Sequence, residues 1–158
     1  MPQTRKLGHI VLKVRDAQKS KEFYTRALGL QVAYEDEHGA VFLSFGVQHH
    51  DLALFQLATG EAPAASQPGL HHTAWQVGSF AELQDAHRQL GELGIAVDAA
   101  VEHNVSRSIY FHDPDGNRVE IYCDMVEDGF AAMRTMGPRR DAIDIATGAI
   151  VGRGKDDE

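Results

Sequence analysis

The sequence predicts an α+β protein made of two tandem βαβββ modules, and three observations support this. The first is an internal repeat, in which residues 9–14 (His-Ile-Val-Leu-Lys-Val) align with residues 72–77 (His-Thr-Ala-Trp-Gln-Val), sixty-three positions later. The second is that a helical pattern and then three β-like runs follow each copy. The third is a stretch rich in proline, glycine and small residues, 59–69, which is typical of a linker.

The first module spans residues 7–58. Its opening strand at 9–14 is followed by a helix expected at 16–28, whose apolar residues fall on one side. Gly29 stands where a helix C-cap belongs. Turn-prone residues then separate three expected strands, at 30–34, 40–45 and 51–57.

The second module spans residues 70–124 and repeats this order. A strand at 72–77 precedes a helix expected at 79–93, and Gly94 ends that helix. A strong turn signal, Asp-Pro-Asp-Gly-Asn at 113–117, lies between the last two strands. The strands of this module are expected at 95–101, 108–111 and 118–122.

The repeat stops after Asp124, so residues 1–124 are expected to form one domain and residues 125–158 a C-terminal extension. A short helix is expected within the extension at 129–136. The polar, glycine-rich end of the chain is expected to be disordered.

The composition and charge of the chain disfavour a nucleic acid partner and insertion into a membrane. Fifteen basic and twenty-three acidic residues give a net charge of −8, which disfavours binding to a nucleic acid backbone. No apolar run approaches the roughly 18 residues needed to span a membrane. Residues 1–6 lack the apolar stretch of a secretory signal, and the single Cys123 can form no internal disulfide. A cytoplasmic location is therefore expected.

Two of the nine histidines, His9 and His72, occupy equivalent positions at the start of the two repeats. One strand histidine alone is more often a half-buried residue bonded to a backbone carbonyl, but its repetition favours a shared role. Register also distinguishes neighbours, because His71 aligns with Gly8, whereas His72 aligns with His9. We expect His9 and His72 to be metal ligands.

Glu120 lies within an apolar run of the last strand, between Val119 and Ile121. A solvent-facing glutamate on an edge strand is the simpler interpretation, but a buried carboxylate needs a partner, and a metal would supply it. Two imidazoles and one carboxylate form the triad typical of non-haem Fe(II) oxygen chemistry.

Several motifs resemble the vicinal oxygen chelate superfamily, which contains glyoxalases, bleomycin-resistance proteins and type I extradiol dioxygenases. They are Gly-His-Ile at residues 8–10, Phe-Tyr at 23–24, Leu-Gly-Leu at 28–30, and Tyr-Phe-His-Asp-Pro-Asp-Gly-Asn-Arg-Val-Glu at 110–120. The resemblance covers about residues 7–124 and is closest to single-domain catechol-cleaving enzymes. It implies a cup-shaped mixed sheet around the metal.

One departure from the family pattern bears on the reaction. Glyoxalase-like members typically take a metal ligand from the last strand of the first module, where this chain has no carboxylate near Leu54. Gln56 is the nearest polar candidate.

The resemblance implies roles for three further residues. His49-His50-Asp51 resembles the double-histidine segment of extradiol enzymes, whose second histidine is the acid or base, which maps to His50. The alternation of the following strand places His50 on one face with Leu52 and Leu54. Tyr110, ten residues before Glu120, has the spacing of the tyrosine that hydrogen-bonds a substrate oxygen.

His103, seven residues before Tyr110, is a candidate for substrate contact, although larger relatives place a histidine nine residues before the tyrosine. The resemblance then implies ring cleavage of a small catechol-type aromatic by Fe(II) and O2, as in aromatic compound catabolism, by a homodimer.

Two alternatives stay open. One is a transferase or isomerase on the same scaffold, similar to fosfomycin-resistance or glyoxalase enzymes, with Mn(II) or another divalent metal. The other is a metal-free drug-binding resistance protein.

Overall fold

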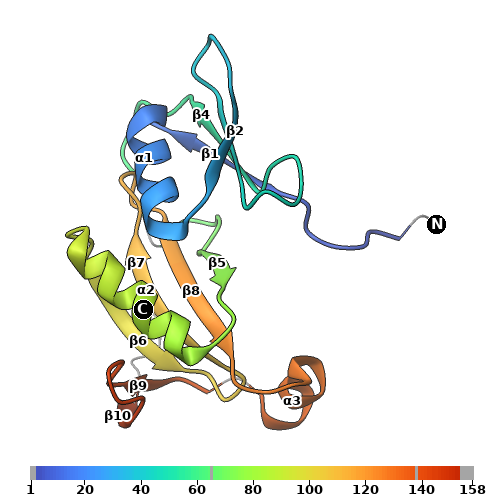
Figure 1. Cartoon of the computed structure of the whole chain (residues 1–158), viewed down its shortest axis with the longest axis vertical. Coiled ribbons are helices and arrows are strands. Elements are labelled where there is room, and N and C mark those ends of the chain that lie inside the picture. The colour runs from blue at the N-terminus through green and yellow to red at the C-terminus, as the bar shows by residue number, and fades with distance from the viewer. Residues whose placement is uncertain (1–2, 65, 138, 154–158) are drawn as a thin grey trace. The chain divides into compact units, whose positions relative to one another are not determined.

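The computed structural model describes residues 3–64, 66–137 and 139–153. The chain divides into two compact units, residues 1–65 and 66–158, and the boundary falls within the stretch 59–69 expected to be a linker. Each unit is described by itself. Each unit combines α-helical structure with a mixed sheet (Figure 1), which confirms the predicted α+β class.

Unit 1 contains one helix and a four-stranded sheet with the order β1-β4-β3-β2. Edge strand β1 is parallel to β4, and the other neighbours are antiparallel. Its elements are β1 (Ile10–Val14), α1 (Ala17–Leu28), β2 (Gln31–Glu35), β3 (Val41–Ser44) and β4 (Leu52–Gln56).

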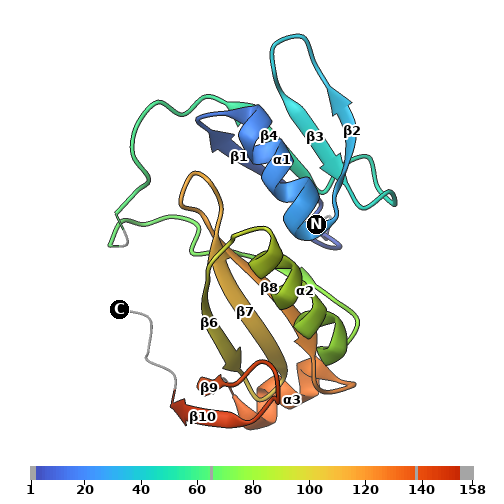
Figure 2. The ribbon, with the colours of Figure 1, turned by 60° about the vertical axis from the view of Figure 1, so that its left-hand side comes forward.

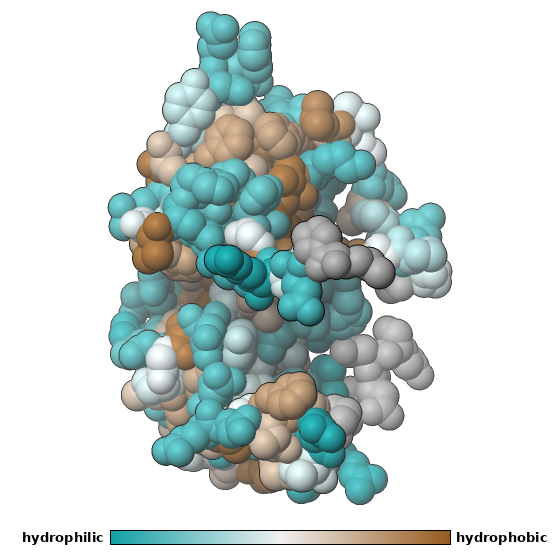
Figure 3. Space-filling model, turned by 90° about the vertical axis from the view of Figure 1, so that its right-hand side faces the viewer, coloured by the Kyte–Doolittle hydropathy of each residue, from teal (hydrophilic) through white to brown (hydrophobic). Residues whose placement is uncertain are grey.

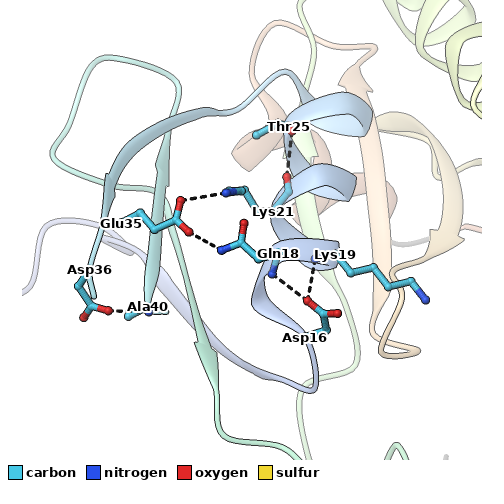
Figure 4. A network of polar contacts seen from close by, with 8 residues as sticks. All are labelled: Asp16, Gln18, Lys19, Lys21, Thr25, Glu35, Asp36 and Ala40. Carbon is cyan, nitrogen blue, oxygen red and sulfur yellow. Dashed lines mark hydrogen bonds and ion pairs between the residues drawn. The ribbon is translucent and has the colours of Figure 1, made fainter. Parts of the chain in front are cut away.

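Helix α1 begins and ends at residues suited to those positions. The Asp16 carboxylate accepts from the backbone N–H of Gln18 as an N-cap, and Gly29 ends the helix with a φ of 72°. Figure 4 shows how the side chains of Gln18 and Lys21 then reach Glu35 at the end of β2, where Lys21 Nζ lies 2.9 Å from Glu35 Oε2. These contacts tie α1 to the edge strand of its sheet.

The sheet of unit 1 has two unlike faces. One packs against α1 and is apolar and buried, and burial of each large side chain contributes about 1.5–3 kcal/mol. The other face is more exposed, with Val11 46% exposed. The buried face carries Leu12, Val14, Val41, Leu43, Leu52 and Leu54.

Unit 2 contains a six-stranded sheet with the order β10-β9-β6-β7-β8-β5, in which only β5 and β8 are parallel among the pairs described. Helix α2 lies across one face of this sheet (Figure 2). The elements are β5 (Thr73–Gln76), α2 (Phe80–Glu92), β6 (Val97–Glu102), β7 (Ser106–His112), β8 (Arg118–Asp124), α3 (Gly129–Met136), β9 (Asp141–Ile143) and β10 (Ile150–Arg153).

Alternation along β7 and β8 separates apolar from polar side chains. Ile109 and Phe111 pair with Ile121 and Val119, and all four are buried on the side of α2. The intervening residues point to the opposite face, which we call the site face of unit 2. It carries Ser108, Tyr110, Glu120 and Tyr122.

The turn between β7 and β8 forms as its sequence predicts. The Asp113 carboxylate accepts hydrogen bonds from the backbone N–H groups of Asp115 and Asn117, at 2.9 and 2.8 Å. Asp113 is only 6% exposed, so these bonds satisfy a buried charge. The turn sets the register in which Tyr110 lies beside Glu120.

The C-terminal extension contains more structure than the sequence indicates. The helix expected at 129–136 is present as α3, but β9 and β10 follow it and extend the sheet from β6. Residues 152 and 153, part of the tail expected to be disordered, belong to β10. The rest of that tail, 154–158, lies outside the described residues.

Hydrophilic side chains cover most of the surface drawn in Figure 3, and apolar ones appear in scattered groups. In the part of the chain that the structure describes, the helices are too short or too polar to cross a membrane.

Candidate metal centre and active site

His72 and Glu120, two of the three ligands predicted from the sequence, meet on the site face of unit 2. His72 immediately precedes β5, which pairs with β8 so that Ala74 lies beside Glu120. Glu120 Oε2 is 2.9 Å from His72 Nε2. Glu120 is 7% exposed and lies on an internal strand, so it is not the solvent-facing residue of an edge strand.

Ser108, which the sequence analysis missed, completes the surroundings of Glu120. Its hydroxyl donates to Glu120 Oε1 at 2.5 Å, from the neighbouring strand β7. Ser108 is fully buried, as is expected of a hydroxyl whose function is to satisfy a buried carboxylate. The two carboxylate oxygens therefore have different partners, and Oε2 is the one directed to His72.

The donor atoms of this pair suit a divalent metal ion. Two ligand atoms bound to one ion at about 2.1 Å, at right angles to each other, lie about 3 Å apart. The observed 2.9 Å between Oε2 and Nε2 agrees with that spacing. An imidazole and a carboxylate are also the donors that zinc, iron and manganese sites share.

His71 contacts the other side of the His72 ring. The two Nδ1 atoms lie 2.6 Å apart. When a histidine binds a metal through Nε2, its Nδ1 carries a hydrogen and needs an acceptor that orients the ring. His71, in its Nε2–H tautomer, would supply such an acceptor, although the repeat alone gave it no role.

His9, the third predicted ligand, belongs to unit 1 and immediately precedes β1. Its ring lies 4.2 Å from that of His50 and 6.0 Å from that of His49, measured between centroids. Among residues 3–64, 66–137 and 139–153, no three His, Cys, Asp or Glu side chains are grouped to hold a metal ion. The three-residue ligand set therefore stays a prediction.

The strand register of unit 1 refines one sequence alignment, which placed the counterpart of Glu120 near Leu54. Val11 and Ala74 each lie two residues after a repeat histidine, and they pair with Ala53 and Glu120 respectively. The counterpart of Glu120 is thus Ala53, not Leu54. Because a shift of one residue changes the face of a strand, Leu54 points into the core under α1.

Gln56, the remaining polar candidate, also lies away from that face. Its Oε1 accepts from the backbone N–H of Ala17 at 3.1 Å, at the start of α1. The face of β4 that corresponds to Glu120 therefore presents Ala53 and Phe55, neither of which can bind a metal through its side chain.

His50 does not lie on the sheet face that strand alternation predicted for it. It precedes β4 between bends at 46–49 and at 51, and its ring centroid is 5.2 Å from that of Phe42. Phe42 pairs with Ala53, so His50 lies on the face opposite Leu52 and Leu54, and the expected shared face is wrong. Burial, and then the nearby His9 and His49, lower the pKa of His50 below its ordinary value. A neutral imidazole able to accept a proton results.

Tyr110 lies directly beside Glu120 in the β7–β8 register. It is 4% exposed, and its ring centroid is 5.8 Å from that of His72. Burial, followed by the negative charge of Glu120, raises the pKa of Tyr110 well above its usual range, so the phenol keeps its hydrogen.

His103 contacts Tyr110, as a shared site requires. His103 Nε2 lies 3.0 Å from the Tyr110 hydroxyl. The guanidinium carbon of Arg118, on β8, stacks 4.4 Å above the Tyr110 ring and brings a positive charge to the same face. Unit 2 thus brings together four of the residues selected from the sequence, namely His72, His103, Tyr110 and Glu120.

Comparisons with known proteins identify relatives of this chain. The chain is 34% identical to biphenyl-2,3-diol 1,2-dioxygenase 2 of Rhodococcus globerulus over 125 residues, covering 78% of this chain and 65% of the relative. It is 36% identical to biphenyl-2,3-diol 1,2-dioxygenase 3 of the same organism over 126 residues, covering 78% and 66%. The chain thus spans just under two thirds of the length of these relatives.

The fold also resembles a solved fosfomycin resistance protein from Listeria monocytogenes. The TM-score is 0.61 with 21% identity, over 79% of this chain and 98% of the other. Residues 6–121 match the family described as Glyoxalase/Bleomycin resistance protein/Dioxygenase superfamily. This match confirms the resemblance that the motifs indicated, and the chain belongs to the glyoxalase, bleomycin resistance protein and dioxygenase superfamily.

Proposed function

We propose that this protein is a non-haem Fe(II)-dependent extradiol dioxygenase that cleaves the ring of a catechol-type aromatic substrate. The observation that carries the proposal is the placement of Tyr110 beside the Glu120–His72 pair on one face of one sheet. A metal-binding carboxylate next to a protonated, buried phenol suits a substrate that presents two adjacent oxygens. The names of the two Rhodococcus relatives support the same substrate class.

His9, His72 and Glu120 would hold the metal in this proposal. When bound, Fe(II) would supply the positive charge that favours an ionised catechol and the redox chemistry that O2 requires. Ser108 would keep Glu120 Oε1 occupied, which leaves Oε2 for the metal. His71 would orient the His72 ring through the contact between their Nδ1 atoms.

His50 would act as the acid or base. Its lowered pKa leaves Nε2 or Nδ1 with a lone pair near neutral pH, so it can take a proton from a catechol hydroxyl. Tyr110 would hold a substrate oxygen by a hydrogen bond and would not itself ionise. His103 would position Tyr110 through the hydrogen bond between His103 Nε2 and the Tyr110 hydroxyl.

A metal-dependent transferase or isomerase is the second candidate, because the fold is similar to that of a fosfomycin resistance protein. That candidate predicts activity with Mn(II) or another divalent ion and no consumption of O2. It assigns no role to His50.

Oxygen uptake by protein reconstituted anaerobically with Fe(II) distinguishes the two. The substrate panel contains several catechols, including 2,3-dihydroxybiphenyl, and the absorbance of the yellow ring-fission product is followed together with O2. Protein loaded with Mn(II) and the variant Glu120→Gln serve as matched controls. Uptake with colour only in the Fe(II) protein supports ring cleavage, whereas tightly bound iron without uptake would turn the assignment to the second candidate.

A further inference from the structure

Residues 139–153, which we call the C-terminal segment, lie beyond residues 6–121 that match the family. They are nevertheless built into unit 2. Strand β9 pairs antiparallel with β6, placing Asp141 beside Glu102 and Ala142 beside Val101. Asp141 is 2% exposed, and its Oδ2 lies 2.5 Å from Nε of Arg139 in the same segment, so the pairing with β6 buries a carboxylate at the start of β9.

The far end of the segment is also docked. The Gln84 side chain of α2 donates to the carbonyls of Ile145 and Ala146, at 3.0 and 2.8 Å. Gly148 lies so close to the Arg107 side chain that an added Cβ would come within 2.5 Å of its Nη1. The φ of Gly148 is 73°, which also disfavours other residues there. Figure 2 shows β9 and β10 continuing the sheet beyond β6.

The segment reaches the site through His103. The backbone carbonyl of Arg139 lies 2.9 Å from His103 Nδ1. The neighbouring residue, Arg140, places its guanidinium carbon 5.9 Å from the centroid of the Tyr110 ring. Two consecutive residues of the segment therefore border the His103–Tyr110 pair.

The chemistry of these contacts determines where the hydrogens lie. A carbonyl oxygen can only accept, so His103 Nδ1 must carry a hydrogen and donate it to Arg139. In neutral His103, Nε2 then has a lone pair and no hydrogen. The 3.0 Å bond between Nε2 and the Tyr110 hydroxyl therefore requires Tyr110 to be the donor.

We propose that the C-terminal segment is a positioning element of the active site: the Arg139 carbonyl fixes His103 as its Nδ1–H tautomer, and His103 takes the hydrogen of the Tyr110 hydroxyl. Tyr110 then presents an acceptor oxygen to the site. It suits a catechol bound as its monoanion, in which the hydroxyl that faces Tyr110 keeps its hydrogen, and it disfavours a methoxy group at that position. This catalytic consequence rests on the proposed function, whereas the tautomer does not.

Long-range proton–nitrogen correlation NMR on the full-length, metal-free protein reads the tautomer directly. His103 is expected as the neutral Nδ1–H form, the opposite of the form that predominates in free histidine. Gly148→Val should detach the segment and move His103 towards the Nε2–H form, and Asp141→Asn provides a second, milder perturbation at the start of β9. His112, which contacts Asp98 at 2.7 Å in the same sheet, is the internal control.

Val151→Thr is the matched control variant, because Val151 lies in the same segment but is 66% exposed. It should leave the His103 signals unchanged. An Nε2–H tautomer in the wild-type protein would overturn the proposal. So would an unchanged tautomer in Gly148→Val or Asp141→Asn when amide exchange shows that β9 has separated from β6.

Kinetics test the consequence for catalysis in the Fe(II)-loaded protein. Gly148→Val is expected to lower kcat about tenfold or more with unchanged iron content, because Tyr110 is no longer held in place. In a Tyr110→Phe background the same substitution should have no further effect, which a general loss of structure would not produce. If the wild-type protein consumes no O2, the proposed function is wrong. The NMR measurement of the His103 tautomer does not depend on that result and still tests the positioning role of the C-terminal segment.

Discussion

Ser108 Oγ donates to Glu120 Oε1 at 2.5 Å while Glu120 Oε2 lies 2.9 Å from His72 Nε2, so one buried carboxylate on β8 contacts both β7 and the residue that precedes β5. Neither oxygen depends on solvent. The carboxylate is therefore held in one orientation before any metal binds, which lowers the reorganisation needed for binding. The following predictions start from this relationship.

Replacing the carboxylate by an amide should remove metal binding with little loss of fold. We expect Glu120→Gln to weaken Fe(II) affinity by about 100-fold or more, because the amide has no charge to offer the ion. Metal content after dialysis, measured by plasma mass spectrometry, checks this, and circular dichroism checks the fold. The control His112→Gln should keep its metal. Full iron occupancy in Glu120→Gln would remove Glu120 from the ligand set.

Removing the Ser108 hydroxyl should act on both stability and metal affinity. Ser108→Ala leaves Glu120 Oε1 without its buried donor, so we expect a loss of about 1–3 kcal/mol in the free energy of unfolding. Metal affinity should fall about 10- to 100-fold. Urea unfolding and metal titration measure the two effects. Ser106→Ala, on the same strand and the same face, is the matched control, and equal behaviour of the two variants would contradict a role for Ser108.

Removing the proposed base should separate catalysis from metal binding. We expect His50→Ala to retain iron and to lower kcat about 10²- to 10⁴-fold. His49→Ala, its direct neighbour, should have a much smaller effect. Steady-state O2 uptake together with metal analysis provides the test, and wild-type turnover in His50→Ala would exclude the acid or base role.

The pH dependence of kcat/KM should reflect the lowered pKa of His50. Because burial lowers the pKa of His50, the base is already neutral at a pH where an ordinary histidine is half protonated. We therefore expect activity to fall on acidification only below about pH 6.5, the unperturbed value. If acidification already lowered kcat/KM above about pH 6.5, a group other than His50 would control the activity.

Ionisation of the Tyr110 phenol should not lower the activity at alkaline pH. Burial and the charge of Glu120 raise its pKa, so it should stay protonated beyond the roughly pH 10 at which exposed tyrosines ionise. The difference in tyrosinate absorbance between the wild-type protein and Tyr110→Phe during an alkaline titration measures this. If the difference in tyrosinate absorbance appeared below about pH 10, the raised pKa of Tyr110 would be contradicted.

Much of the fold is encoded locally. The internal repeat makes His9 and His72 equivalent, and local capping by Asp16 and Gly29 delimits a helix that short-range hydrogen bonds alone can recognise. The alternation around Glu120 separates apolar from polar faces in the same way. These features depend on neighbours in sequence, so the sequence by itself determined the two modules and, through the family resemblance, selected His72, Glu120 and Tyr110 as candidates.

Contacts between distant segments decided the rest. Whether Ala53 or Leu54 corresponds to Glu120 depends on how β4 pairs with β1, and a slip of one residue exchanges the two faces. His50 precedes its strand, so alternation does not govern its direction. Ser108 looks like any strand serine until β8 brings Glu120 beside it. Strand β9 has three residues, a length with no reliable sequence signal, and exists because β6 offers an edge. Pairing, burial and register are properties of the folded chain, and only the tertiary structure could supply them.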